Sequence, residues 1–169
     1  NLAISSPDNT DGDGLVIAIG SPGFEKNFDI NNQNCPGDIN YGKVDIFEYS
    51  SSNDSFNSIG EIYGGDLDGI EACDLFSRSF GGSSIALSDD GTILAVATKY
   101  AEDSAGAIFI FQYLSDTWTL KYKLAGDDSL TGSSSIGFAS TLSLSADGMT
   151  LATGSYLAES GKGEVKVYN

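Results

Sequence analysis

The chain repeats itself at an offset of 57 residues, and this repetition limits its possible folds more than any other feature. Residues 85–91 align with residues 142–148 at this offset. The same offset also aligns residues 94–97 with 151–154, Gly106 with Gly163, and residues 108–111 with 165–168. A looser, earlier copy runs through residues 2–5, 13–14, 17–20 and 42–47, stretched by insertions. The sequence therefore predicts nearly three copies of one structural unit.

Each copy is predicted to consist of short strands without helices. Residues 93–98 and 107–113 are rich in Val, Ile, Phe and Tyr, which favour strands, and Gly, Asp, Asn and Ser separate such runs. Hairpin turns are expected at Asp90-Gly91 and Asp147-Gly148, because Gly and Asp tolerate the positive φ angles that tight turns need. An outer strand is expected at 118–124, where polar and apolar residues alternate, and its counterpart in the first copy is expected at 56–63.

The predicted fold class is therefore all-β, an array of four-stranded antiparallel blades of the β-propeller kind. The blades are expected at residues 1–65, 79–127 and 137–169, and the last lacks its outer strand. Three blades do not close a ring, so we expect protein partners to complete it: further blades, copies of the chain or a different subunit. Because the sequence begins within an inner strand and stops within a third strand, a segment of a longer propeller is the favoured alternative.

Charge narrows the choice of partners. The 169 residues include 8 Lys and Arg, 24 Asp and Glu and no His, for a net charge of −16. Such a chain repels phosphate backbones and anionic lipid headgroups, so nucleic acid is not an expected partner. No apolar run is long enough to span a bilayer. Because the first residue is Asn, we expect that a leader peptide is removed from the protein. Without His, the commonest general base is missing, and we expect no catalytic activity.

Two groups of residues resemble a known family. Residues 80–97, followed by residues 106–111 and Trp118, resemble the FG-GAP repeat of integrin-α-like β-propellers. Residues 19–22 look like the Gly-Ala-Pro element of that family, and residues 138–140 look like a degenerate Phe-Gly element. The resemblance covers nearly the whole chain and implies the fold more than the function, since the motif residues serve turns and packing between blades.

The same resemblance implies a candidate calcium loop, because some FG-GAP domains bind calcium between their first two strands. The candidate ligands are Asn9, Asp11 and Asp13, ahead of Gly14. Clustered oxygen ligands on a turn suit this cation. Ile17 stands where the pattern requires an acidic residue, so a solvated acidic turn remains the alternative. No other cofactor is expected.

The two cysteines are predicted to meet. In a blade of antiparallel strands, the link between the second and third strands and the link to the next blade emerge at the same end. Cys35 lies in the first kind of link and Cys73 in the second. A disulfide there would indicate an extracellular location or an oxidising organelle lumen, and two unpaired thiols are the alternative. Asn53 begins a glycosylation sequon.

The leading functional hypothesis is a non-catalytic binding or adhesion module that presents loops on a rigid scaffold. The candidate ligand-binding residues, in an insertion and in the loop after the first blade, are Phe24, Phe28, Asp29, Asp66, Asp68 and Glu71. The alternative is a structural or accessory subunit that docks on a larger assembly, whether or not that assembly lies at a membrane. Calcium-dependent, integrin-like recognition is less favoured, and paired carboxylates such as Asp66 with Asp68 are insufficient evidence for an enzyme.

Overall fold

The computed structural model describes residues 1–8, 12–24, 42–67, 84–98, 101, 105–126, 138–156, 158 and 162–169. These residues form three antiparallel sheets, which we call blades one, two and three. Blade one contains β1 (Leu2–Ile4), β2 (Val16–Ser21), β3 (Lys43–Ser50) and β4 (Ser55–Tyr63), followed by the short 3₁₀ helix η1 (Gly64–Asp66). Blade two contains β5 (Ser84–Leu87), β6 (Ile93–Thr98), β7 (Ala107–Leu114) and β8 (Thr117–Ala125). Blade three contains β9 (Thr141–Leu144), β10 (Leu151–Ser155) and β11 (Glu164–Tyr168).

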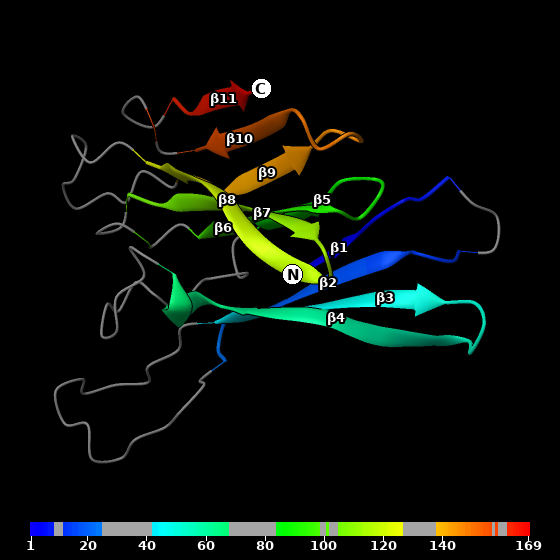
Figure 1. The fold of residues 1–169 in the computed structure, drawn as a ribbon. Coiled ribbons are helices and arrows are strands. Elements are labelled where there is room, and N and C mark those ends of the chain that lie inside the picture. The colour runs from blue at the N-terminus through cyan, green and yellow to red at the C-terminus, as the bar shows by residue number, and fades with distance from the viewer. Residues whose placement is uncertain are drawn as a thin grey trace, which may run out of the picture.

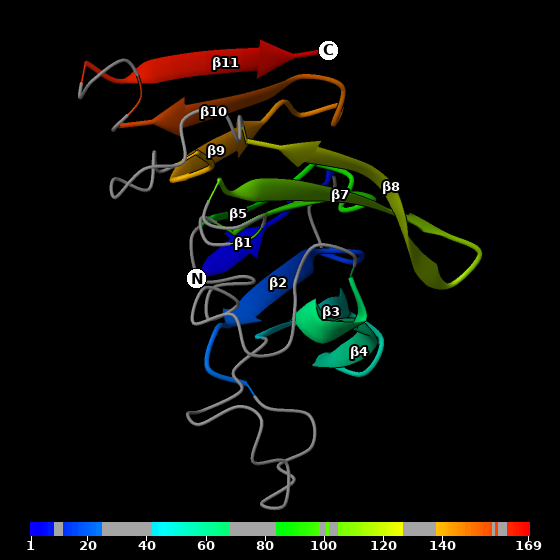
Figure 2. The same ribbon diagram turned by 90° about the vertical axis from the view of Figure 1, so that its left-hand side faces the viewer.

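The blades stack face to face, with blade two in the middle (Figures 1 and 2). Side chains alternate between the two faces of each strand, so each sheet can bury one row of residues on each side. One apolar core, which includes Ile46, Leu94 and Phe109, fills the space between blades one and two. A second core, which includes Ala97, Ile108 and Phe138, lies between blades two and three. Blade two is therefore covered on both faces.

The sequence repeat is also a structural repeat. Ala97 pairs with Ile108 in blade two, and the residues 57 positions later, Gly154 and Val165, pair in the same way in blade three. The prediction of an all-β array of antiparallel blades is confirmed. Both expected hairpin turns are present, with Gly91 at φ 70° and Gly148 at φ 71°.

The first two blades also share a bulge in their outer half. The register between β3 and β4 shifts at Ile46/Phe47, and the register between β7 and β8 shifts at the corresponding Ile110/Phe111. A bulge increases the local twist of a strand pair. This shared irregularity shows that blades one and two have the same construction, despite the insertions that separate their strands in the sequence.

Candidate functional site

In blade two and again in blade three, a compact hydrogen-bonded turn joins the first strand of the blade to its second strand. In blade two, the Ser88 hydroxyl donates to Asp90 Oδ1 at 2.6 Å and accepts from the Ile93 N–H at 2.9 Å. The Thr92 N–H donates to the same Asp90 oxygen at 3.0 Å. Burial acts to raise the pKa of Asp90, but the hydrogen bonds from Ser88 and Thr92 outweigh it and hold this pKa below its ordinary value.

Blade three repeats this turn with Ser145, Asp147 and Thr150. The Ser145 hydroxyl donates to Asp147 Oδ1 at 2.6 Å and accepts from the Thr150 N–H at 2.9 Å. The hydrogen bond from Ser145 lowers the pKa of Asp147. In blade one, Ser5 Oγ still accepts from the Val16 N–H at 2.7 Å, but Asp13 Oδ1 accepts from the Ser51 N–H, at 2.9 Å. The Asp13 carboxylate of blade one therefore accepts a hydrogen bond from the turn between β3 and β4.

These turns also carry hydrogen bonds from one blade to the next. The Ser6 N–H of blade one donates to the Asp89 carbonyl of blade two at 3.1 Å. The Asp89 N–H in turn donates to the Ala146 carbonyl of blade three at 2.8 Å. Ala146 occupies the same position in the last blade, and its N–H has no backbone acceptor among the described residues. Within the described part of the chain, the series of hydrogen bonds thus ends at the Ala146 N–H.

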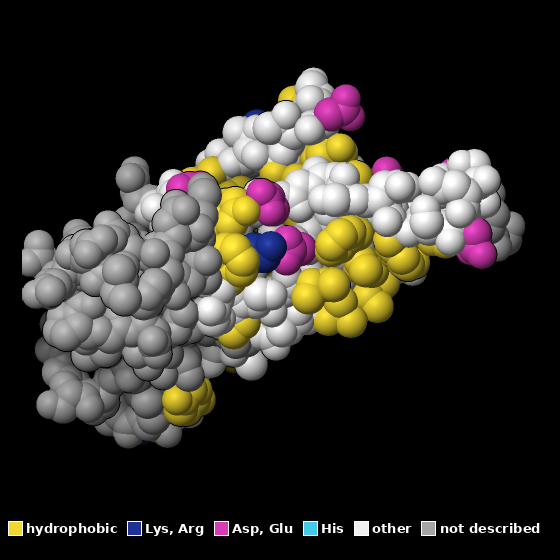
Figure 3. All heavy atoms as spheres, turned by 90° about the horizontal axis from the view of Figure 1, so that it is seen from below, with side chains coloured by type: hydrophobic (Ala, Val, Ile, Leu, Met, Phe, Trp, Pro, Cys, Tyr) yellow, Lys and Arg dark blue, Asp and Glu magenta, His cyan; other side chains and the backbone are white. Residues whose placement is uncertain are grey.

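The face of blade one that points away from blade two is apolar and exposed. Leu2 and Ile4 are each 57 % exposed, whereas the corresponding Ile85 and Leu87 of blade two are each 8 % exposed because blade one covers them. Figure 3 shows hydrophobic side chains gathered on this side of the molecule. We call this surface the leading face.

An aromatic side chain marks the outer edge of the leading face. Phe56 packs beside Tyr49 with ring centroids 5.4 Å apart, as Trp118 packs beside Tyr113 at 5.2 Å in blade two. Trp118 lies against blade one, so close to Gly60 that a Cβ there would be 2.6 Å from Trp118 Cδ1. The matching Phe56 is 47 % exposed. At the positions of Leu2, Ile4 and Phe56, the leading face therefore carries apolar side chains as the covered face of blade two does, whereas Lys43 and Asp45 stand where blade two has Ala107 and Phe109.

A charged pair also lies on the leading face. Lys43 Nζ is 2.8 Å from Asp45, and the corresponding residues of blade three, Glu164 and Lys166, form the same pair at 3.4 Å with the charges exchanged. Lys166 belongs to the face of blade three that packs on blade two, with its Nζ 5.9 Å from the centre of the Phe138 ring. A charged pair at this position is thus tolerated next to a neighbouring blade.

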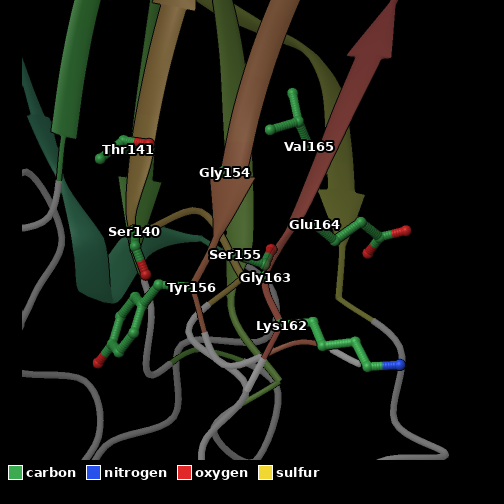
Figure 4. A pocket seen from close by; sticks show the side chains of 9 residues that line it. All are labelled: Ser140, Thr141, Gly154, Ser155, Tyr156, Lys162, Gly163, Glu164 and Val165. Carbon is green, nitrogen blue, oxygen red and sulfur yellow. The ribbon is translucent and has the colours of Figure 1, made fainter. Parts of the chain in front are cut away.

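The opposite end of the stack, which we call the trailing face, belongs to blade three. Val165 is 73 % exposed, whereas the corresponding Ile108 of blade two is fully buried. Val167, two residues further along the same strand, is 60 % exposed. A pocket of about 400 Å³ indents this face. Its lining residues are Ser140, Thr141, Gly154, Ser155, Tyr156, Lys162, Gly163, Glu164 and Val165 (Figure 4). In Figure 4, Tyr156 and Lys162 lie at the loop end, and Thr141 and Val165 lie further along the strands.

A cluster made of Phe24, Lys43 and Tyr63 lies at the end of blade one where β3 begins and β4 ends. Among the predicted ligand-binding residues, Phe24 packs against Tyr63 with ring centroids 5.7 Å apart, and Lys43 Nζ lies 4.4 Å from the centre of the Phe24 ring. A hydrogen bond with Glu61 raises the pKa of Tyr63 to about 12. Asp66 is exposed and ends η1, directly after the strand that carries Tyr63. Sequence reasoning missed Lys43 and Tyr63, since nothing in their local pattern distinguishes them from other strand residues.

Several predicted site residues lie outside the described residues: Asn9, Asp11, Phe28, Asp29, Cys35, Asp68, Glu71 and Cys73. Asp13 is exposed, and within the described ranges no three His, Cys, Asp or Glu side chains are grouped closely enough to hold a metal ion. The calcium loop and the disulfide therefore stay predictions. Asn53 lies exposed in the turn between β3 and β4, and its glycosylation also stays a prediction.

The stacked antiparallel blades, two of four strands and one of three among the described residues, define a β-propeller scaffold. A similar solved structure is the periplasmic gluconolactonase PpgL of Pseudomonas aeruginosa, with a TM-score of 0.51 and 16 % sequence identity. The match covers 99 % of this chain and 38 % of that structure, so the chain spans less than half the length of the propeller it resembles. No family model matches the chain, and no curated protein sequence matches it.

This match corrects one prediction. The expectation that the chain is not an enzyme rested on its lack of His and on the insufficient evidence from its carboxylate pairs. PpgL, a solved structure with the same scaffold, is an enzyme, and this contradicts the expectation. At 16 % identity the likeness shows the fold alone. As for membranes, the described part of the chain contains no helix long and apolar enough to cross one.

Proposed function

We propose that this chain is a protein-binding scaffold, a run of propeller blades whose leading and trailing faces each bind a further blade. One observation carries the proposal. The positions that are buried between blades inside the chain are the same positions that are exposed at its two ends. Leu87, at 8 % exposure, and Ile4, at 57 %, are the clearest pair.

Burial of these faces supplies the driving force. Burying an apolar side chain contributes roughly 1.5–3 kcal/mol relative to leaving it exposed, so covering Leu2, Ile4 and Phe56 together would provide several kcal/mol before the costs of association. Exposed apolar patches of this kind mark interaction surfaces. The net charge of −16 opposes the binding of a second acidic molecule and favours a partner whose surface near the blades is neutral or basic.

Photo-crosslinking tests the proposal at defined positions. A photoreactive phenylalanine analogue replaces Ile4 on the leading face, Val167 on the trailing face or, as a control, Leu114, which is 60 % exposed near the tip of the β7–β8 hairpin. We expect crosslinks from positions 4 and 167 to strand-rich segments outside residues 1–169 in the native source, and none from position 114. Equal crosslinking at all three positions, or none at positions 4 and 167, would refute the proposal.

A second candidate function is recognition of a ligand at the loop end of blade one. The Phe24, Lys43 and Tyr63 cluster supports it, because two aromatic rings 5.7 Å apart and a cation 4.4 Å from one of them form a contact surface for a planar group. Replacing Phe24 and Tyr63 by Ala would then weaken ligand binding, while crosslinking from positions 4 and 167 would be unchanged.

The proposed location is extracellular or within an oxidising compartment. The periplasmic location of PpgL and the predicted Cys35–Cys73 pairing support it. The resemblance to the FG-GAP repeat remains part of the proposal, as the source of the expected blade motifs. Mass spectrometry of the native protein, with and without reduction, tests the disulfide, since a pair of free thiols would leave the mass unchanged.

A further inference from the structure

The pocket on the trailing face corresponds to a surface that is covered inside the chain. Three of its lining residues, Gly154, Gly163 and Val165, lie 57 positions after Ala97, Gly106 and Ile108 of blade two. The strand pairing confirms this correspondence, because Gly154 pairs with Val165 as Ala97 pairs with Ile108. The pocket and the matching surface of blade two therefore have the same backbone frame.

In blade two, Phe138 covers that surface. Phe138 is 4 % exposed and belongs to the same core as Ala97 and Ile108, both of which are fully buried. Its backbone also runs close to Gly106, where a Cβ would lie 2.8 Å from the Phe138 carbonyl oxygen and 3.3 Å from Phe138 Cβ. Phe138 precedes the inner strand of blade three by three residues. Phe138 thus joins blade three to blade two just ahead of the inner strand of blade three, and the residue at the corresponding position ahead of blade two is Gly81.

The trailing pocket retains the space that this contact needs. In front of Gly163, a Cβ would meet nothing closer than the Ser155 carbonyl oxygen at 3.7 Å. Two lining residues of the pocket are smaller than their counterparts in blade two, because Gly154 replaces Ala97 and Val165 replaces Ile108. Thr141, which also lines the pocket, stands where blade two has Ser84, and a Cβ at Gly154 would lie 2.8 Å from the Thr141 Oγ1, so the room for a ring lies in front of Gly163 and Val165.

We propose that this pocket is a socket for the aromatic side chain of a further blade, a residue that stands three positions ahead of that blade's inner strand, as Phe138 does in blade three. The inference rests on the proposed function, because it names how the trailing face recognises the blade that covers it. The socket selects blades that are preceded by an aromatic residue. The Ala146 N–H, by contrast, can bind the turn carbonyl of any blade.

An extension of the chain tests the socket. A second copy of residues 113–169 is attached directly after Asn169, which preserves the 57-residue register. The copied Thr117–Ala125 then supplies the outer strand of blade three, and the copied Phe138 lies ahead of a fourth inner strand. The matched control carries Ala instead of Phe at the copied position 138 only.

Two nuclear magnetic resonance signals distinguish insertion of the aromatic ring into the socket from docking of a blade without such insertion. In the Phe extension, we expect the copied Phe138 ring to shift the methyl resonances of Val165 upfield. The resonances of Ile108, which lies in the same core as Phe138, serve as the internal reference for such a shift. The Ala control should lack this shift. In both extensions, exchange of the Ala146 amide hydrogen should slow, because the docked blade accepts its hydrogen bond.

The outcomes are distinct. A slowed Ala146 amide with unshifted Val165 methyl groups would overturn the socket and leave the proposed function standing. Unchanged signals at both positions in a folded extension would overturn both. A Val165 shift that appears in the unextended chain as its concentration rises would identify a second copy as the occupant and also overturn the proposal. If the extension does not fold, a synthetic peptide of residues 136–148 added to the unextended chain replaces it, with its Phe138→Ala counterpart as control, and the Phe peptide alone should shift Val165.

Discussion

Gly148 of blade three lies directly against Ile93 of blade two, and a Cβ at Gly148 would be 2.8 Å from Ile93 Cγ1. Likewise, a Cβ at Gly91 of blade two would be 2.5 Å from Cγ2 of Val16 in blade one. In blades two and three, the turn between the first two strands is therefore also a contact point with the preceding blade. Gly14 occupies this position in blade one, where a Cβ would meet only Glu48, at 3.9 Å.

Replacing Gly148 by Ala should destabilise the protein by about 1–3 kcal/mol, because the residue has a positive φ and its Cβ would collide with a branched side chain. Urea unfolding followed by Trp118 fluorescence measures this change. Gly23→Ala is the control, since nothing lies within 4 Å of the added Cβ, and it should change stability by less than about 0.5 kcal/mol. Equal effects of the two substitutions would contradict the packing argument.

Ile4 and Leu87 form a matched pair at corresponding positions in blades one and two. Leu87→Ala should cost about 2–4 kcal/mol, because it opens a cavity in the core between the blades. Ile4→Ala should cost less than about 1 kcal/mol in the isolated chain, since Ile4 is 57 % exposed. Thermal or urea unfolding of both variants measures the difference. A large cost for Ile4→Ala in the monomer would show that the leading face is already covered.

Acid should weaken the turns of blades two and three. The pKa values of Asp90 and Asp147 lie below their ordinary value of 3.8 in the folded chain, so both groups stabilise the fold fully above that pH. The stabilisation is lost as the pH falls through the lowered pKa values. Asp147→Ala should therefore destabilise the chain at pH 6 more than at pH 2.5, as measured by urea unfolding at both values. Asp66→Ala, at an exposed position, serves as the control.

Calcium binding is predicted for the loop of residues 8–14. If Asp13 is a ligand, calcium should raise the melting temperature of the chain, and Asp13→Ala should abolish that rise. Asp13→Ala will also remove the hydrogen bond to the Ser51 N–H, so its melting temperature without calcium must be compared first. Asp54→Ala, in the neighbouring β3–β4 turn, is the control. An unchanged melting temperature of the parent chain in millimolar calcium would make the loop a solvated acidic turn.

Local sequence signals predicted most of the strands. The runs at 93–98 and 107–113 coincide with β6 and with nearly all of β7, because β-branched and aromatic residues on both sides of a buried strand give an unambiguous pattern. The Asp-Gly pairs predicted both hairpin turns for an equally local reason, since only a few residues tolerate positive φ. The candidate site was less predictable. Of its residues, Phe24 and Asp66 were expected from loop composition, whereas Lys43 and Tyr63 meet Phe24 only through strand pairing.

The sequence alone determined the repeating unit, its strand order and the positions that alternate between the two faces of each blade. These properties follow from local propensity and from a period of two residues along each strand. Only the tertiary structure decided which copies of a position are buried. Leu87 and Ile4 occupy corresponding positions and are both apolar, and the presence of a neighbouring blade is what separates 8 % from 57 % exposure. For the same reason, a surface that Phe138 covers in blade two becomes a pocket in blade three, because burial depends on what lies on the other side of the sheet.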